Sequence, residues 1–235
     1  MLAVFKKEMR SYFTSVIGYV FLVLYLAIAG ALFCYTTLYS MSSNVTTFYT
    51  FMLIVSSVML PLLTMKSFSE EKKTKTEQLL LTSPVSIIGI VSGKFLAAFS
   101  VFAACMVLNS LYFFFLTSYA TLKVAVLIGN LLAILLVGMV YIAIGLFISS
   151  LTENQLSAAI GTMAVILGFL LIGALGSLIP SEYAIRYAFD FVSIFTRFQA
   201  FTAGYLDIAA LFYYVSVAFI FLYLTVRIYD RRRYN

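Results

Sequence analysis

Long hydrophobic runs alternate with short polar segments along this chain. A helix needs about 20 mostly apolar residues to cross the hydrocarbon of a bilayer, and six of the runs approach or exceed that length. They cover residues 16–39, 48–65, 87–117, 123–149, 156–179 and 206–226. This pattern predicts an all-α integral membrane protein, in which residues 1–235 form a single transmembrane domain with six transmembrane helices.

A short segment with one basic and one apolar face precedes the first run. It covers residues 2–13 (LAVFKKEMRSYF). At helical spacing Lys6, Lys7 and Arg10 gather on one side and the apolar side chains on the other. The apolar set is Leu2, Phe5, Met9, Tyr12 and Phe13. The pattern predicts an N-terminal amphipathic helix lying in the membrane interface. A plain basic flank of the first span is the alternative.

Charge is concentrated in one segment, residues 66–86 (KSFSEEKKTKTEQLLLTSPVS), where seven of the first twelve residues are Lys or Glu. Two helix-start signatures occur in it, Ser67-x-x-Glu70 and Thr74-x-x-Glu77. Three leucines follow the second, and Pro84 then stops the run. We therefore expect a short helix over 76–81. Its leucines pack either on the protein's own membrane domain or in a groove of a separate protein.

The connection between the fifth and sixth runs, residues 180–205, is too apolar for a water-exposed loop. Its composition favours one or two helices that re-enter the membrane partway. Arg186 and Asp190 stand four residues apart, and Arg197 follows two turns later. These three charges are candidates for an external gate. Alternatively, the segment is an interfacial helix that shields the bundle, with its charges solvated.

The 15 Lys and Arg residues are unevenly divided between the two sides that six spans define. Only Lys123, Arg186 and Arg197 fall on the side of residues 180–205. The other 12 fall on the side that carries the chain ends and residues 66–86. One of these, Lys94, lies just inside the third hydrophobic run. Cytoplasmic loops carry the excess of Lys and Arg, so both termini and residues 66–86 are predicted to be cytoplasmic. Lys94, at the start of the third run, is expected to snorkel to this interface.

The amino-acid composition limits the kinds of chemistry that the chain can perform. The chain is 63% hydrophobic and 10% charged, against roughly 25% charged residues in soluble domains. It has no His, and Cys34 and Cys105 form no C-x-x-C pair, so neither a metal centre nor a cofactor site is expected. No phosphate-binding Gly-x-x-x-x-Gly-Lys-[Ser/Thr] loop is present. The net charge of +6 fits attraction to anionic membrane lipids rather than to nucleic acid.

The charged segment resembles the cytoplasmic loop of the ABC-2 family of ABC transporter permeases. The resemblance rests on Phe68, on the Glu70-Glu71-Lys72 triplet, on the TEQLLLTSPVS stretch of residues 76–86, and on Gly93-Lys94. Residues 204–207 (GYLD) and 221–233 (FLYLTVRIYDRRR) are similar to the subset that includes gliding-motility permeases and the permease of nitrous oxide reductase maturation. Six spans, an interfacial helix and a re-entrant external segment agree with that family.

The resemblance implies a permease subunit of an ATP-driven exporter in a prokaryotic cytoplasmic membrane. The loop would act as a coupling helix on an ATP-binding cassette subunit, present in two copies, which would hold the ATP and Mg²⁺. A second permease copy, identical or homologous, would complete the transporter. The residues expected to contact the ATPase are Glu70, Glu71, Thr76, Glu77, Leu79 and Leu80.

Two other functions compete with transport. One is a membrane scaffold or sensor whose cytoplasmic loop binds a cytosolic partner. The other is a membrane enzyme acting on lipid, which is disfavoured because the chain lacks His and clustered catalytic carboxylates. Glu70 and Glu71, the one adjacent pair, would point about 100° apart on a helix.

Overall fold

The computed structural model describes residues 1–41, 44–78, 85–116, 124–179, 184–202, 204 and 207–234, and none of these residues lies in a β-strand. The helices are α1 (Leu2–Thr14), α2 (Val16–Phe33), the π-helical turn η1 (Cys34–Tyr39), α3 (Val45–Thr64), α4 (Lys66–Lys73), α6 (Ile87–Leu116), α7 (Val124–Leu151), α8 (Gln155–Leu178), α9 (Ala184–Val192), α10 (Ile194–Thr202) and α11 (Ile208–Tyr234).

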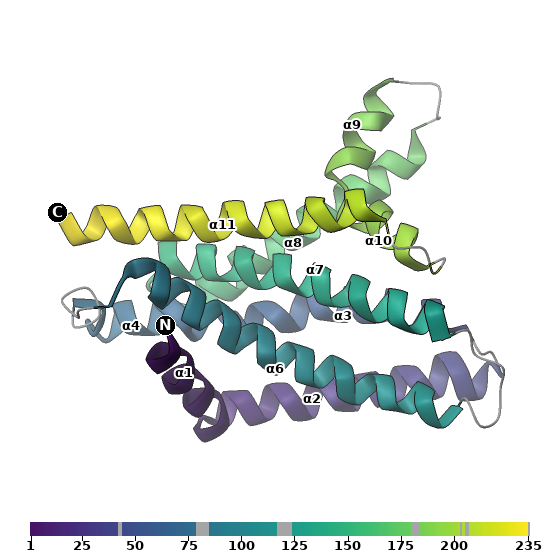
Figure 1. The fold of residues 1–235 in the computed structure, drawn as a ribbon, viewed down its shortest axis with the longest axis horizontal. Coiled ribbons are helices and arrows are strands. Elements are labelled where there is room, and N and C mark those ends of the chain that lie inside the picture. Colours follow the sequence, from purple (N-terminus) through teal and green to yellow (C-terminus); the bar gives the residue numbers. More distant parts are fainter. Residues whose placement is uncertain are drawn as a thin grey trace.

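Six of the helical segments are long and apolar enough to span a membrane, which confirms the predicted number. They are α2 with η1, α3 with α4, and then α6, α7, α8 and α11. They run roughly along one direction, and both chain ends lie at the same end of the bundle (Figure 1). The last helix continues well past the predicted end of its span at residue 226. Its final turns carry arginines, which end the apolar run but favour helix.

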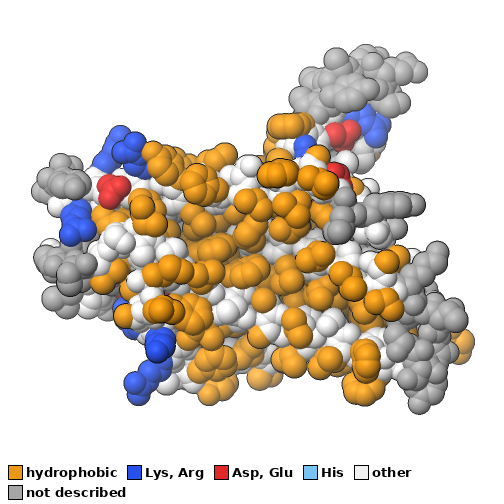
Figure 2. Space-filling model, viewed as in Figure 1, with side chains coloured by type: hydrophobic (Ala, Val, Ile, Leu, Met, Phe, Trp, Pro, Cys, Tyr) orange, Lys and Arg blue, Asp and Glu red, His pale blue; other side chains and the backbone are white. Residues whose placement is uncertain are grey.

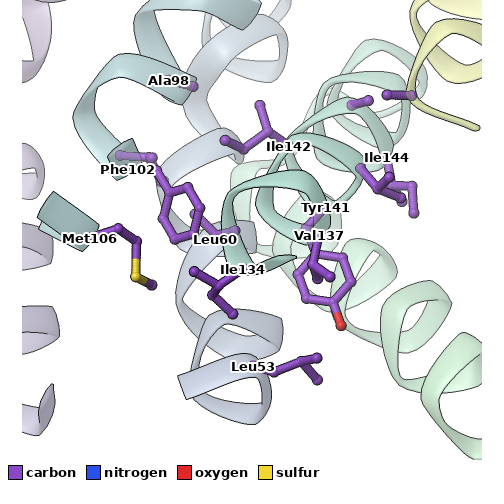
Figure 3. Close-up of a cluster of buried hydrophobic side chains, with 14 of the residues drawn as sticks. Leu53, Leu60, Ala98, Phe102, Met106, Ile134, Val137, Tyr141, Ile142 and Ile144 are labelled. Atoms are coloured by element: carbon purple, nitrogen blue, oxygen red, sulfur yellow. The ribbon is translucent and has the colours of Figure 1, made fainter. Parts of the chain in front are cut away.

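Helix α7 is the centre of the bundle and is buried over more of its length than any other span among the described residues. It packs against α3, α6, α8 and α11. In Figure 3 Leu60 of α3 and Phe102 of α6 lie together on the side of α7 that carries Ile134. Val137 and Tyr141 of α7 lie farther from Phe102, and all five side chains are buried. Since lipid tails are as apolar as these side chains, close packing rather than hydrophobicity holds such spans together.

Two glycines let neighbouring helices approach α7 closely. A Cβ on Gly138 would lie 2.0 Å from the Phe102 ring, and one on Gly145 would lie 2.1 Å from the Thr64 hydroxyl oxygen. Real Cβ atoms do not occupy such positions, so only glycine fits at these two contacts. α6 and α3 therefore meet α7 at distances that any larger residue would increase.

The two ends of the bundle differ in charge. Hydrophobic side chains cover the middle of the face seen in Figure 2, and Lys and Arg side chains gather at the end where α1, α4 and the last turns of α11 lie. Helix α1 crosses this end at a steep angle to the spans (Figure 1), as expected for an interfacial helix. Its Glu8 is buried against the bundle, whereas Leu2 and Phe13 are exposed, where lipid can cover them.

The connection before the last span folds into two short helices, α9 and α10, at the opposite end of the bundle (Figure 1). α10 packs on α7 and α8, and α9 packs on α8. Arg186 and Asp190 form the i,i+4 ion pair that their spacing indicates, with 3.4 Å between Nε and Oδ2. Re-entry of this segment into the membrane stays a prediction.

Candidate functional site: the charged end of the bundle

The first part of the charged segment is a helix joined almost directly to a span. α3 ends at Thr64 and α4 begins at Lys66, and the Met65 N–H still donates to the Pro61 carbonyl oxygen at 2.9 Å. The predicted helix start at Ser67 is therefore wrong, because the helix is already under way there. Residues 79–81, half of the second expected helix 76–81, lie outside the described residues; Thr76 lies in a turn, and Glu77 and Gln78 are helical.

Ser149 of α7 supplies the cap that α4 lacks in its own sequence. Its hydroxyl oxygen accepts hydrogen bonds from the backbone N–H groups of Phe68 and Ser69, both at 3.1 Å, and donates to the Met65 carbonyl oxygen at 3.1 Å. These backbone groups belong to the first turn of a helix, where N–H groups have no partner within the helix. One buried hydroxyl on α7 thus fixes the start of α4.

Lys94 of α6 is the buried centre of an ion cluster, which we define as Lys94, Glu8, Glu71 and the more exposed Lys7. The Lys94 Nζ lies 2.9 Å from a Glu8 carboxylate oxygen and 2.9 Å from a Glu71 carboxylate oxygen, and donates to the Ser67 carbonyl oxygen at 2.6 Å. An ammonium group has three donors, and all three are used. Its side chain is 1% exposed. The prediction that Lys94 snorkels to the cytoplasmic interface is wrong, because its ammonium group is enclosed and partners on α1 and α4 satisfy its charge.

Lys7 balances the second negative charge of the ion cluster. Its Nζ lies 3.1 Å from the Glu71 carboxylate. Burial would lower the pKa of Lys7, but the charges of Glu71 and Glu8 outweigh it and raise that pKa above its ordinary value. Lys7 therefore stays cationic at neutral pH, and the cluster holds two positive and two negative groups. Each of the charges of Glu8, Glu71 and Lys94 has a partner on another helix, so the cluster joins α1, α4 and α6.

The last helix is tied to the same end of the bundle. The Tyr229 ring of α11 lies 4.8 Å, centroid to centroid, from the Phe68 ring of α4. Arg232 pairs with Glu77 at 2.9 Å and donates to the Ser150 carbonyl oxygen of α7 at 3.3 Å. A shift of the charged segment would therefore be transmitted to α1, α6, α7 and α11 together.

The residues expected to contact an ATPase divide into two sets. Glu71 and Glu77 point inward into ion pairs, with 14% and 16% of their side chains exposed. Glu70 is about half exposed beside Lys66, and Thr76 is exposed. Leu79 and Leu80 lie outside the described residues. The surface available to a partner at the described part of this segment therefore includes Glu70 and Thr76.

Sequence reasoning missed Glu8, Ser149 and the role of Lys94. Weak signals existed: Glu8 is the one acidic residue in a basic amphipathic helix, and Lys94 interrupts an apolar run. Neither signal names a partner, because the three residues are at least 55 positions apart in the chain. Among the residues that the structure describes, no group of three or more His, Cys, Asp and Glu side chains could hold a metal ion.

At the opposite end, Arg197 is placed apart from the Arg186–Asp190 pair. Its guanidinium lies 4.4 Å from the centroid of the Tyr213 ring and 5.1 Å from that of Phe191. Such cation–π contacts hold α10 against α9 and α11. This arrangement gives Arg197 a packing contact; whether the three charges form an external gate stays a prediction.

Comparison with known proteins agrees with the architecture. The family described as ABC-2 family transporter protein matches residues 35–229, which is most of the chain and includes α4, α6 and the α9–α10 segment. A search of curated proteins found no match. With six apolar spans and a family match over most of its length, this multi-pass membrane protein belongs to the ABC-2 family and is a membrane component of an ABC transporter.

Proposed function

We propose that this chain is the permease subunit of an ATP-driven exporter, which couples ATP binding and hydrolysis in a separate ATPase subunit to movement of substrate across or out of the cytoplasmic membrane. The observation that supports coupling most directly is the ion cluster. It ties the charged segment to the interfacial helix and to a span through contacts of 2.9–3.1 Å.

The route of a mechanical signal follows from these contacts. An ATPase that moves residues 66–86 pulls on α4, which continues into α3 through Met65 and is bonded to α7 through Ser149. The buried charges of Lys94 and Glu71 resist separation, because an unpaired charge in this setting costs several kcal/mol. α1 and α6 therefore move with α4, and the helices change their packing as a unit.

The assembly that this function needs extends beyond the chain. We propose two ATPase copies, which hold ATP and Mg²⁺, and a second permease, identical or homologous. The excess of Lys and Arg at the end with α1 and α4 supports a cytoplasmic location of that end. The ATPase would meet Glu70, Thr76 and the leucines at 79 and 80. The sequence of the last helix supports membership in the subset of gliding-motility and nitrous-oxide-reductase-maturation permeases.

The test is co-purification from the native membrane with a tagged chain. We expect a P-loop ATPase to co-purify with the wild-type protein and to be lost from the double variant Leu79→Asp, Leu80→Asp, because two carboxylates cannot enter an apolar groove without large cost. Mass spectrometry identifies the partner, and ATP hydrolysis by the purified complex confirms it.

The matched control places two aspartates at the other end of the bundle, with Tyr39→Asp and Met41→Asp. Both side chains are largely exposed, at 83% and 95%, so this variant should retain the ATPase. If the wild-type chain brings down no ATPase but another cytosolic protein, the scaffold function replaces the exporter. Loss of the ATPase from both variants would place its contact away from residues 79 and 80.

A further inference from the structure

A cavity of about 520 Å³ lies toward the end of the bundle that carries α9 and α10. Cavities of this size accommodate small organic ligands. Helices α3, α8, α9 and α10 contribute its walls. The lining residues that matter here are Leu53, Ile54, Leu167, Leu171, Arg186, Asp190 and Phe195.

The lining changes from apolar to polar along α8. Leu167 and Ser177 both face the cavity, and ten residues of helix place them about 15 Å apart along the axis. This is about half the thickness of a hydrocarbon core. Deep in the cavity the walls are leucines, and the charged side chains of α9 stand at its outer rim. An amphiphile with its chain inward and its head at the rim matches this gradient.

The cavity opens sideways as well. Ile54 of α3 and Leu171 of α8 line it and are also 50% and 62% exposed on the surface of the bundle. Both belong to spanning helices, so their exposed sides face hydrocarbon in a membrane. A ligand can therefore enter from the bilayer without passing through water, which favours a lipid over a water-soluble compound.

The rim carries one positive and one negative group. Arg186 lies 3.4 Å from Asp190 and donates to the Ile179 carbonyl oxygen at 2.9 Å. About a third of each of the two charged side chains is exposed, at 34% and 35%. A guanidinium has five N–H donors, and the contacts of Arg186 to the described residues use two of them. The rest can bind a phosphate, while the Asp190 carboxylate can bind an ammonium group.

We propose that this cavity binds a zwitterionic phospholipid, with an acyl chain among the leucines of α3 and α8, the phosphate on Arg186 and the ammonium group on Asp190. A purely anionic lipid would place its negative head beside Asp190 with no cation of its own to offset the repulsion. Binding at this site needs no ATPase, so this proposal can be tested independently of the proposed exporter function.

The chain has no Trp, so a single introduced Trp is a clean reporter. We choose Phe195→Trp, at a position that lines the cavity, and titrate the purified protein in detergent with phosphatidylethanolamine that carries brominated acyl chains. Saturable quenching of the Trp fluorescence is expected. Adding Arg186→Gln or Asp190→Asn should weaken binding roughly tenfold, as loss of a hydrogen bond to a charged group does.

The matched control is Phe212→Trp on α11, a position 65% exposed and absent from the cavity, where quenching should rise without saturation. Leu171→Trp serves as the reporter if the Phe195 variant does not fold. The proposal is overturned if quenching at both cavity reporters follows the Phe212 control, as it would if a second copy of the chain covers the opening. It is also overturned if brominated phosphatidylglycerol binds as tightly as phosphatidylethanolamine.

Discussion

Replacing Lys94 by alanine should lower the free energy of unfolding by roughly 3–5 kcal/mol, the usual cost of removing one partner from a buried ion pair. The variant leaves the carboxylates of Glu8 and Glu71 facing each other, with Lys7 the nearest remaining cation of the cluster. A denaturing-detergent titration of the purified protein, followed by circular dichroism, measures the change.

Two controls separate the effect of charge from that of packing. Lys66→Ala removes a cation from the more exposed pair with Glu70, and it should cost less than about 1 kcal/mol. The triple variant Lys94→Met, Glu8→Gln, Glu71→Gln removes every charge around the ammonium site except Lys7 and should recover much of the loss. A loss below about 1 kcal/mol for Lys94→Ala would show that the ion cluster does not hold α1 and α4 to α6.

The second large effect is expected at Gly138, where alanine should destabilise the protein by about 1–3 kcal/mol or more. The added Cβ would stand 2.0 Å from the ring of Phe102, which is fully buried. Either α6 must separate from α7 or the ring must leave its rotamer. The same detergent titration measures the loss.

Gly168 of α8 is a matched control, because a Cβ there meets no atom within 4 Å. Gly168→Ala should be neutral or stabilising by up to about 1 kcal/mol, since alanine favours helix over glycine. Combining Gly138→Ala with Phe102→Leu should recover part of the loss, because the two side chains then no longer overlap. Equal effects of the Gly138 and Gly168 substitutions would contradict the close contact between α6 and α7.

The two glycines show where sequence reasoning reaches its limit. Gly138 and Gly168 look alike in the sequence, since each interrupts an apolar run in a spanning helix. Yet a Cβ at Gly138 would lie 2.0 Å from the Phe102 ring, whereas one at Gly168 would meet no atom within 4 Å. Which helix approaches which glycine depends on the rotation of each span about its axis, and runs that are apolar all round carry no information on that rotation.

The charged segment divides in the same way. Its concentration of Lys and Glu was evident from the sequence, and in the structure α4 carries much of this charge and pairs it with nearby residues. The direction in which each side chain points was not evident. Glu70 and Glu71 are neighbours, yet one is about half exposed and the other is enclosed against Lys94. The difference of about 100° between successive helix positions matters only once α1 and α6 are in place.

Run length and charge were enough to establish an integral membrane protein with six spans, an amphipathic first helix and a strongly basic end, because a bilayer demands a fixed length of apolar helix whatever the helix packs against. Tertiary structure alone decided that α7 is central, that Lys94 is enclosed, that Ser149 caps α4 and that the Arg186–Asp190 pair lies at a cavity lined also by α3 and α10. Each of these depends on which groups from distant parts of the chain come within a few ångströms of one another, and local pattern does not specify that.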